Sequence, residues 1–308
     1  MINKELIDFI STRLKIASRD LIEKDIILSK ILFHLMQDKT FSQNYAFKGG
    51  TCLTKCYLGY YRFSEDMDFT YLNQKDFIGK SKNKLRETMS DKINQLGKLI
   101  ETIAKKLDLD FKLEKENKRY FQFGGSNAFV TFKIWYNSIE LGKETFVKIQ
   151  VNHIEKLNYP IKELNVNFIL SKNLEKDFSF IAGEDADVLL KPLKIKVYDL
   201  KEILIEKIRA ILTRRGIKAR DFVDVFLIVK KEKLNLNDFK KEIIEKINNM
   251  MKFEKYNQNI KNKETQLKED LILGEEEALM LFPIDKGFPK FIKEFNQFLM
   301  DIIKELKI

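Results

Sequence analysis

The chain has 308 residues, 44% of them hydrophobic and 33% charged, and it carries a formal net charge of +10. This balance excludes a disordered protein and favours a globular one, with room for one large domain or two modest ones. No apolar run approaches the roughly 20 residues that a membrane helix needs, and MINKELIDFI at the start lacks the pattern of a secretory signal. We therefore expect a cytoplasmic protein with no membrane partner.

The first half of the chain alternates helical and strand patterns. Apolar residues recur at helical spacing from Leu6 to Met36 and predict two helices. The segment NYAFKGGTCLTKCYLGYYRFSEDMDFTYL then predicts a strand, a glycine turn, a helix, a loop and a second strand. Polar periodic residues from Gln74 to Leu107 predict one or two solvent-facing helices. The runs YFQFGG, NAFVTFKIWYN and ETFVKIQVNHI predict an antiparallel meander.

The last third of the chain is helical. After Pro192 the apolar spacing changes, and we expect a helical unit that starts near Val197. Residues 252–269 are rich in Lys, Asn, Gln and Glu, and we expect a mobile surface segment there. The fold class that follows is α+β, with a small mixed sheet and flanking helices in residues 1–196 and a helical bundle in residues 197–308.

Two carboxylates lie two residues apart in SEDMDF. Because the residues after Asp68 favour a strand, period two places Asp66 and Asp68 on the same face, about 7 Å apart at Cα. Such a pair can hold one or two Mg²⁺ ions. Asp-x-Asp pairs are also common in solvated turns, so the interpretation depends on what lies beside them.

A glycine turn precedes the carboxylates. Gly49 and Gly50 end the first predicted strand, and Thr51 is expected to cap the N-terminus of the next helix. Free backbone N–H groups and the positive helix end would then face outward to bind phosphates. Beside a metal-binding pair on the adjacent strand, the turn would complete a triphosphate site, whereas alone it is an ordinary tight turn.

The string FKGGTCLTKCYLGYYRFSEDMDF resembles the first motif of the AbiEii/AbiGii toxin-like nucleotidyltransferases, within the DNA polymerase β-like nucleotidyltransferase superfamily. In that motif a Gly-Gly-Thr or Gly-Ser turn precedes Ser-x-Asp-x-Asp. The resemblance implies a polymerase β-like domain in which Asp66 and Asp68 bind the metal. It also implies nucleotide contacts from the turn and from the serine that follows it: Gly49, Gly50, Thr51 and Ser64.

A second string, EKIRAILTRRGIKARDFVDVFLI, is similar to the family's helical motif of Glu-Lys, a downstream Arg, and Arg-Asp-x-x-Asp. The resemblance implies catalytic roles for Lys207 and Asp221. Periodicity independently places Lys207 in the middle of an apolar helix face, where a lysine is costly unless an anion meets it. That anion is either a nucleotide phosphate or a core carboxylate. The alternative for Asp221 and Asp224 is that they only stabilise a helix N-terminus and have no catalytic role.

One position departs from the superfamily pattern. Polymerase β-like enzymes usually add a third carboxylate from a neighbouring strand. The matching strand here reads VKIQVNH, and Gln150 holds that position. Because an amide cannot act as a base, either Asp221 or another group replaces the carboxylate, or activity is reduced.

These features predict a nucleotidyltransferase that uses Mg²⁺ or Mn²⁺ to move a nucleoside monophosphate from a nucleoside triphosphate to an acceptor hydroxyl. The resemblance and the charge of +10 favour RNA, in particular a tRNA end, as the acceptor, and a toxin with an antitoxin protein as partner. Lysines can also simply solvate helices. Two alternatives stay open: a small-molecule nucleotidyltransferase of the aminoglycoside-modifying kind, and a catalytically weak relative that binds nucleic acid or protein.

Overall fold

The computed structural model divides the chain into two compact units. It describes residues 3–124, 128–170, 181–183, 185–269 and 271–306. The first unit comprises Met1–Lys156 and Ile161–Tyr198, and the second comprises Leu157–Pro160 and Asp199–Ile308. The chain therefore enters the second unit briefly before it returns to complete the first.

The first unit is a sheet with helices. Its helices and helical turns are α1 (Lys4–Leu14), α2 (Arg19–Gln37), α3 (Lys39–Asn44), α4 (Gly49–Cys52), the π-helical turn η1 (Leu53–Tyr57), the 3-10 turn η2 (Gln74–Asp76), α5 (Lys82–Lys106) and α7 (Asp185–Leu190). Its strands are β1 (Tyr45–Lys48), β2 (Asp66–Tyr71), β3 (Phe121–Gly124), β4 (Phe129–Ser138), β5 (Lys143–Asn152), β6 (Lys162–Val166) and β7 (Leu193–Val197).

The strands form one mixed sheet in the order β3-β4-β5-β2-β1-β7-β6. β3, β4 and β5 pair antiparallel, which confirms the predicted meander. β2 runs parallel to β5, β1 runs parallel to β7, and the β1–β2 and β6–β7 pairs are antiparallel. The predicted fold class is confirmed. The sequence patterns do not reveal β6 and β7. β6 (KELNV) has only two apolar residues, and β7 (LKIKV) alternates but directly precedes the region where helical spacing begins.

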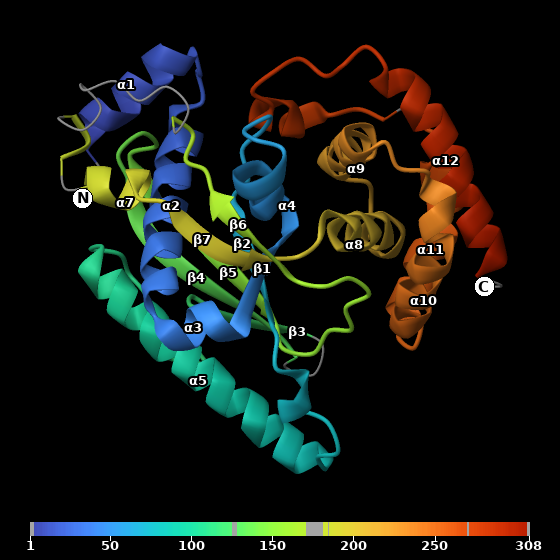
Figure 1. Cartoon of the computed structure of the whole chain (residues 1–308), viewed down its shortest axis with the longest axis horizontal. Helices are drawn as coiled ribbons and strands as arrows, with labels where there is room; N and C mark the ends of the chain where they lie inside the picture. The colour runs from blue at the N-terminus through green and yellow to red at the C-terminus, as the bar shows by residue number, and fades with distance from the viewer. Residues whose placement is uncertain (1–2, 125–127, 171–180, 184, 270, 307–308) are drawn as a thin grey trace. The chain divides into compact units, whose positions relative to one another are not determined.

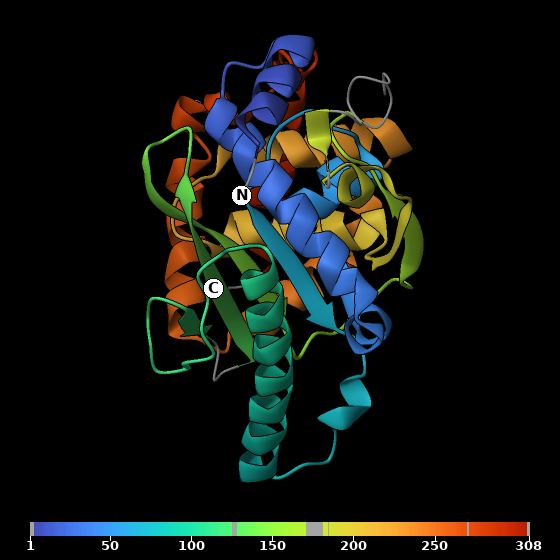
Figure 2. The same ribbon diagram turned by 90° about the vertical axis from the view of Figure 1, so that its left-hand side faces the viewer.

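Helices α2, α3 and α5 cover one face of the sheet (Figures 1 and 2). In β5, Val147, Ile149 and Val151 are buried, whereas Lys148 and Gln150 between them are partly exposed. This alternation is what a strand with one covered face requires. The lysine and the glutamine therefore belong to the face opposite the three helices.

β2 shows the same alternation. Phe69 is fully buried, and its ring packs edge-on against Phe41 of α3 at 5.1 Å between centroids. Asp66 and Asp68 are partly exposed and occupy the alternate positions. Both carboxylates therefore lie on the face opposite the helices, as period two predicts.

α5 is a single helix of 25 residues. Its buried side chains recur every three or four residues, through Met89, Ile93, Leu96 and Ile100. Because this stripe packs toward the sheet, only the other side of the helix faces solvent. The sequence predicted one or two solvent-facing helices here. The structure has one, and one of its faces is covered by the sheet.

The second unit is helical, as predicted. Its elements are α8 (Leu200–Thr213), α9 (Ala219–Glu232), η3 (Leu236–Phe239), α10 (Lys240–Met250), α11 (Glu254–Gln266), η4 (Gly274–Leu279) and α12 (Phe288–Glu305). α8 packs against α9, α10 and α11. The carboxylate of Glu202 on α8 accepts hydrogen bonds from the backbone N–H groups of Asn158 and Tyr159, at 2.8 and 3.0 Å. These bonds hold the short segment Leu157–Pro160 in the second unit.

α11 corrects the expectation of a mobile segment at residues 252–269. Ile260 and Lys263 on this helix are fully buried. The Lys263 ammonium donates hydrogen bonds to the Gly216 carbonyl and to Oε1 of Gln266. Burial, assisted by the nearby charge of Arg214, lowers the pKa of Lys263 to about 8. The polar composition conceals the helix because so few of its residues face inward.

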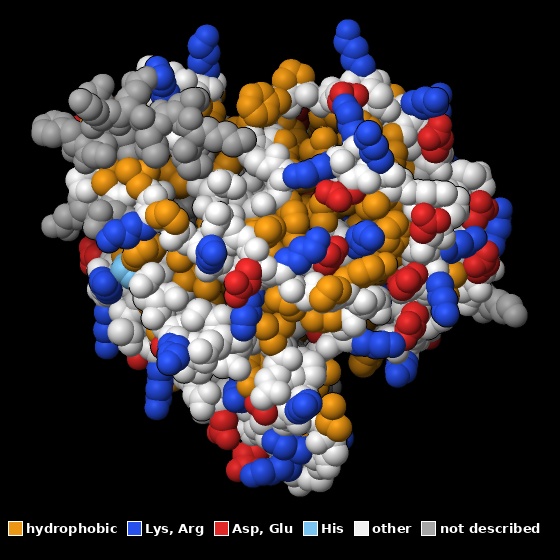
Figure 3. All heavy atoms as spheres, in the orientation of Figure 1, with side chains coloured by type: hydrophobic (Ala, Val, Ile, Leu, Met, Phe, Trp, Pro, Cys, Tyr) orange, Lys and Arg blue, Asp and Glu red, His pale blue; other side chains and the backbone are white. Residues whose placement is uncertain are grey.

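None of the described helices combines the length and the hydropathy needed to cross a bilayer. On the face drawn in Figure 3, Lys and Arg side chains are interspersed with Asp and Glu rather than gathered in one patch. The net positive charge therefore does not by itself locate a polyanion-binding surface on this face.

Candidate active site

The carboxylate pair lies in a row of side chains that crosses three strands. Asp66 is in register with Lys148 on β5, and Asp68 is in register with Gln150 on β5 and with Lys48 on β1. Residues paired across neighbouring strands share a face of the sheet. The row therefore brings two carboxylates, one amide and two lysines together on the face opposite the helices.

The glycine turn lies directly against this row. Gly49 has a φ of +75°, a conformation that favours glycine. A Cβ atom on Gly49 would lie 2.3 Å from Oδ2 of Asp68, and a Cβ atom on Gly50 would lie 2.5 Å from Nη2 of Arg62. Any larger residue would displace the carboxylate or the guanidinium. Glycine at both positions therefore lets the turn pack this closely against Asp68 and Arg62.

Thr51 does not cap the helix, and that expectation is wrong. α4 begins at Gly49, the capping position is Lys48, and no side chain caps it. Thr51 is buried inside the first turn, where its hydroxyl donates to the main-chain carbonyl of Asp66 and lies 2.8 Å from Oγ of Ser64. Thr51 thus ties the glycine turn to β2 and to the serine of the predicted site.

Gln150 lies opposite Asp68. It therefore occupies the position of the missing third carboxylate, as the strand pattern indicates. Lys148, which is not among the predicted site residues, has its ammonium 3.3 Å from Oδ1 of Asp66. Lys148 lies two residues before Gln150 in an alternating strand, and this spacing could have placed it on the same face of the sheet. The site therefore has an amide in the position of the third carboxylate and a cation beside Asp66.

A further carboxylate on this side of the sheet is not among the predicted site residues. Glu155, just beyond β5, accepts a hydrogen bond from Nδ2 of Asn152 at 3.0 Å, and its Oε2 lies 3.6 Å from Nζ of Lys48. Lys48 is buried and lies over the ring of Tyr198, 5.2 Å from its centroid. Because Glu155 follows the strand by three residues, no periodicity connects it to the row.

Lys207 and Asp221 belong to the second unit and form a cluster of their own. Nζ of Lys207 lies 2.7 Å from Oδ1 of Asp221 and 2.6 Å from Oδ2 of Asp224, and Nη1 of Arg214 lies 2.6 Å from Oδ2 of Asp221. Burial raises the pKa of Asp221, but the charges of Lys207 and Arg214 outweigh it, and this pKa lies below its usual range. The sequence left two anions open for Lys207, a nucleotide phosphate or a core carboxylate. In the structure its partners are the core carboxylates of Asp221 and Asp224.

The donor set of the first unit suits a hard divalent cation. Asp66 and Asp68 offer carboxylate oxygens, which Mg²⁺ and Mn²⁺ prefer, and Gln150 offers an amide oxygen. Within the part of the chain that the structure describes, no group of three or more His, Cys, Asp or Glu side chains could hold a metal ion. Mg²⁺ in proteins commonly takes only one or two carboxylates and completes its coordination with substrate phosphates and water.

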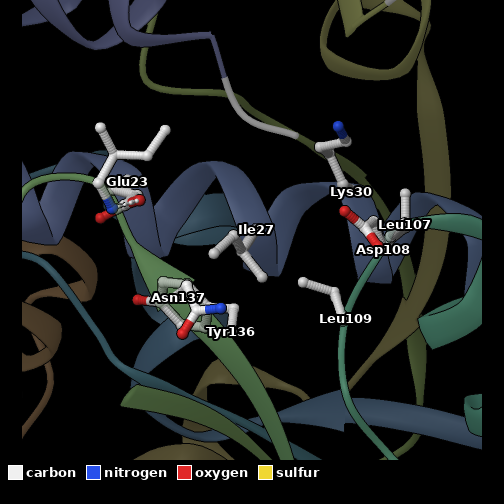
Figure 4. Close-up of a pocket in the computed structure, with 9 residues that line it drawn as sticks. Glu23, Ile27, Lys30, Leu107, Asp108, Leu109, Tyr136 and Asn137 are labelled. Carbon is white, nitrogen blue, oxygen red and sulfur yellow. Dashed lines mark hydrogen bonds between the residues drawn. The ribbon is translucent and has the colours of Figure 1, made fainter. Parts of the chain in front are cut away.

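A pocket on the helical side of the sheet is distinct from this row. Its volume is about 150 Å³, and it is lined by residues of α2, β4 and the segments that follow α5 and β4: Glu23, Ile27, Lys30, Leu107, Asp108, Leu109, Tyr136, Asn137 and Ile139 (Figure 4). The Glu23 carboxylate already accepts hydrogen bonds from Oγ of Ser138 and from the N–H of Ile139, at 2.5 and 2.8 Å. None of the predicted site residues lines this pocket.

One family model and several solved structures are similar to the chain. The family model described as "Nucleotidyl transferase AbiEii toxin, Type IV TA system" matches residues 30–305. No curated protein matches the chain. Among solved structures, the chain is similar to JHP933 from Helicobacter pylori, with a TM-score of 0.44, 14% identity and 95% of each chain covered.

Two further solved structures are similar to the chain. The first is the nucleotidyltransferase toxin MenT4 from Mycobacterium tuberculosis H37Rv, with a TM-score of 0.42 and 15% identity. The second is a putative nucleotidyltransferase from H. pylori, with a TM-score of 0.42 and 16% identity. In both comparisons 95% of this chain and 98% of the other chain are covered.

A glycine turn packed against a carboxylate pair on a mixed sheet is typical of nucleotidyltransferases, and the family match assigns the chain to that class of enzyme. The chain belongs to the AbiEii family of nucleotidyltransferase toxins of type IV toxin-antitoxin systems. Membership implies a nucleoside triphosphate substrate and an antitoxin partner.

Proposed function

We propose that this enzyme transfers a nucleoside monophosphate from a nucleoside triphosphate to a hydroxyl of RNA, in particular at a tRNA end, in a reaction that releases pyrophosphate and depends on Mg²⁺ or Mn²⁺. The observation that carries the proposal is the contact between the glycine turn and the carboxylate pair. A Cβ on Gly49 would lie 2.3 Å from Oδ2 of Asp68, so phosphates at the turn would also lie beside the carboxylates.

Asp66 and Asp68 would hold the cation, which would neutralise the phosphate oxygens when bound. The turn would contact the phosphates through backbone N–H groups at the start of the α4–η1 helical stretch. Glycine at positions 49 and 50 lets the backbone come close, and Ser64 beside Gly50 adds a hydroxyl. Because Thr51 is buried and its hydroxyl is already bonded, its contribution would come from its backbone.

The acceptor hydroxyl must lose a proton, and Gln150 cannot take it. Phosphoryl transfer depends chiefly on positioning and on neutralisation of charge, so a strong base is not required. Lys148, beside Asp66, adds a positive charge to the row at the edge nearest β4. The arrangement therefore supports transfer by orientation and electrostatics rather than by a dedicated carboxylate base.

The test is direct transfer of label. The purified protein is incubated with Mg²⁺, each α-labelled nucleoside triphosphate in turn, and total bacterial RNA, with Asp66→Ala and Asp68→Ala as silent controls. We expect label in RNA from the wild type only. If nucleotide binds but label never enters RNA, the RNA acceptor is wrong, and a panel of small hydroxylated acceptors should be tried. If no nucleotide binds, the proposed site is wrong.

The resemblance also assigns Lys207 and Asp221 to the reaction, and the same assay tests this assignment separately. Asp221→Asn keeps the shape of the side chain and removes its charge. If a folded Asp221→Asn protein, verified by its circular dichroism, loses transfer, the residue takes part in the reaction. If transfer persists, the Lys207 cluster is structural only.

A further inference from the structure

The row that contains Asp66 continues across β5 onto β4. Asp66 is in register with Lys148, and Lys148 is in register with Lys133. One step along the strands, Phe146 is in register with Trp135. All of these side chains share the face of the sheet that bears the carboxylates. We call Lys133, Trp135, Phe146 and Lys148 the basic-aromatic face.

Two lysines directly opposite each other on neighbouring strands repel and destabilise a sheet. Here both ammonium groups also approach one ring, since Nζ of Lys148 lies 5.6 Å and Nζ of Lys133 lies 5.9 Å from the centroid of Phe146. Lys148 has Asp66 as a counter-charge at 3.3 Å. Among the described residues, Lys133 has no carboxylate within ion-pair distance; its ammonium donates to the Lys118 carbonyl at 3.2 Å. An anion bound here would relieve this repulsion.

The aromatic side chains are also placed to receive planar groups. Trp135 and Phe146 lie 4.6 Å apart at their centroids, and both are partly exposed. The guanidinium of Arg119 stacks over Trp135 at 4.3 Å. Single-stranded nucleic acids are bound by sheet surfaces that combine aromatic side chains or Arg planes with a positive track for the phosphates.

We propose that the basic-aromatic face binds single-stranded RNA and leads its end toward Asp66. This inference rests on the proposed function, because it makes the bound RNA the acceptor. Arg119 is neutralised by Asp110 and Glu144, each 2.6 Å away. Phosphates should therefore follow the Lys133–Lys148 row, which ends at the carboxylate pair, while bases lie toward the aromatic side chains.

The experiment measures RNA binding without nucleoside triphosphate, so that no transfer occurs. A labelled single-stranded oligoribonucleotide is titrated by fluorescence anisotropy at several salt concentrations, with wild type, Lys133→Ala and Lys143→Ala. Lys143 is exposed and lies on the same strand as Lys148, but at an odd-numbered position that belongs to the opposite face. It is the matched control.

A lysine that contacts one phosphate of a single strand contributes about 0.7 to the slope of log K against log salt concentration. We expect Lys133→Ala to reduce the magnitude of the slope by about 0.7, and Lys143→Ala to leave it unchanged. Trp135 is the only tryptophan of the chain, so its emission should change on saturation with RNA and not with nucleoside triphosphate alone. Equal slopes for all three proteins, the result expected of a protein-binding face, would overturn the proposal.

Comparison with the transfer assay separates the two proposals. Transfer to RNA together with unchanged slopes would keep the proposed function and reject the basic-aromatic face. A reduced slope for Lys133→Ala without transfer to RNA would keep the face as an RNA-binding surface and reject RNA as acceptor. Absence of RNA binding by the wild type would reject both.

Discussion

Each unit of the molecule has a cluster of carboxylates and lysine, and the two clusters differ in burial. In the first unit, Lys148 and Asp66 are 3.3 Å apart, and their side chains are 34% and 29% exposed. In the second unit, Lys207 lies within 2.7 Å of Asp221 and Asp224, whose side chains are 2% and 0% exposed. The chemistry is the same, but the carboxylates are shielded from water only in the second cluster.

This difference decides what each cluster can do. A pair that is partly in water gains little from its ion pair, so a ligand can replace either partner at small cost. A buried ion cluster is different, because removal of one partner leaves the others uncompensated in a medium that cannot solvate them. The open cluster is therefore suited to exchange its partners for metal and phosphate, while the closed one contributes to the fold whatever its part in the reaction.

The largest effect should come from Lys207→Met, which keeps the apolar stem and removes the charge. Two buried carboxylates would lose their shared cation, and we expect the free energy of unfolding to fall by about 3 to 5 kcal/mol. Urea denaturation of the full chain, followed by circular dichroism, measures it.

The control is Lys201→Met, at an exposed lysine of the same helix. We expect a change within about 0.5 kcal/mol there, as for other surface substitutions. A similarly small loss for Lys207→Met would mean that the cluster does not stabilise the unit, and the contrast between the clusters would fail.

A smaller effect should come from His153, a buried ionisable group with no counter-charge. Its side chain is fully buried. Burial, together with the charge of Lys92, lowers the pKa of His153 from 6.5 to about 4. Between these pH values the unfolded chain binds a proton that the folded chain does not bind. Acidification should therefore cost about 3 kcal/mol of unfolding free energy through this residue.

His153→Phe should remove this part of the acid destabilisation. The difference in unfolding free energy between wild type and variant is measured by urea denaturation at intervals from pH 7.5 to pH 4. His34→Phe serves as the comparison, because His34 is the only other histidine and is only partly buried. Parallel curves for wild type and His153→Phe would show that His153 is not held neutral.

The local parts of the fold and site could be predicted from sequence. Alternation of apolar and polar residues was enough for the meander, and period two placed Asp66 and Asp68 on one face. The glycine turn was equally local. β6 was not predictable, because its sequence KELNV contains only two apolar residues. α11 was not predicted, because its composition is polar and a buried lysine cannot be recognised from composition.

The contacts between distant segments could not be predicted in the same way. Lys148 meets Asp66 only because of the register between β5 and β2, and a one-residue shift would have turned Lys148 away. Similarly, the periodicity of α8 showed that Lys207 needed an anion, but only the packing of α9 against α8 supplies Asp221 and Asp224. Sequence thus indicates the need for a partner, whereas tertiary structure selects it.

The smallest effect on stability should come from Asp66→Asn. The pair with Lys148 is partly exposed on both sides, so its loss should change the unfolding free energy by less than about 1 kcal/mol. The same variant should abolish nucleotide transfer, because an amide oxygen carries no charge to hold a divalent cation. Urea denaturation and the labelled-nucleotide assay on one preparation measure both quantities.

These two measurements on Asp66→Asn decide whether the comparison between the clusters is right. A loss of stability as large as that of Lys207→Met would make the β2 carboxylate a structural group like those of the second unit. Retained transfer in the folded variant would remove Asp66 from the reaction. Lost transfer with unchanged stability is the result expected of a ligand-binding carboxylate, because a partly exposed ion pair contributes little to the fold and its partner can be replaced by substrate at small cost.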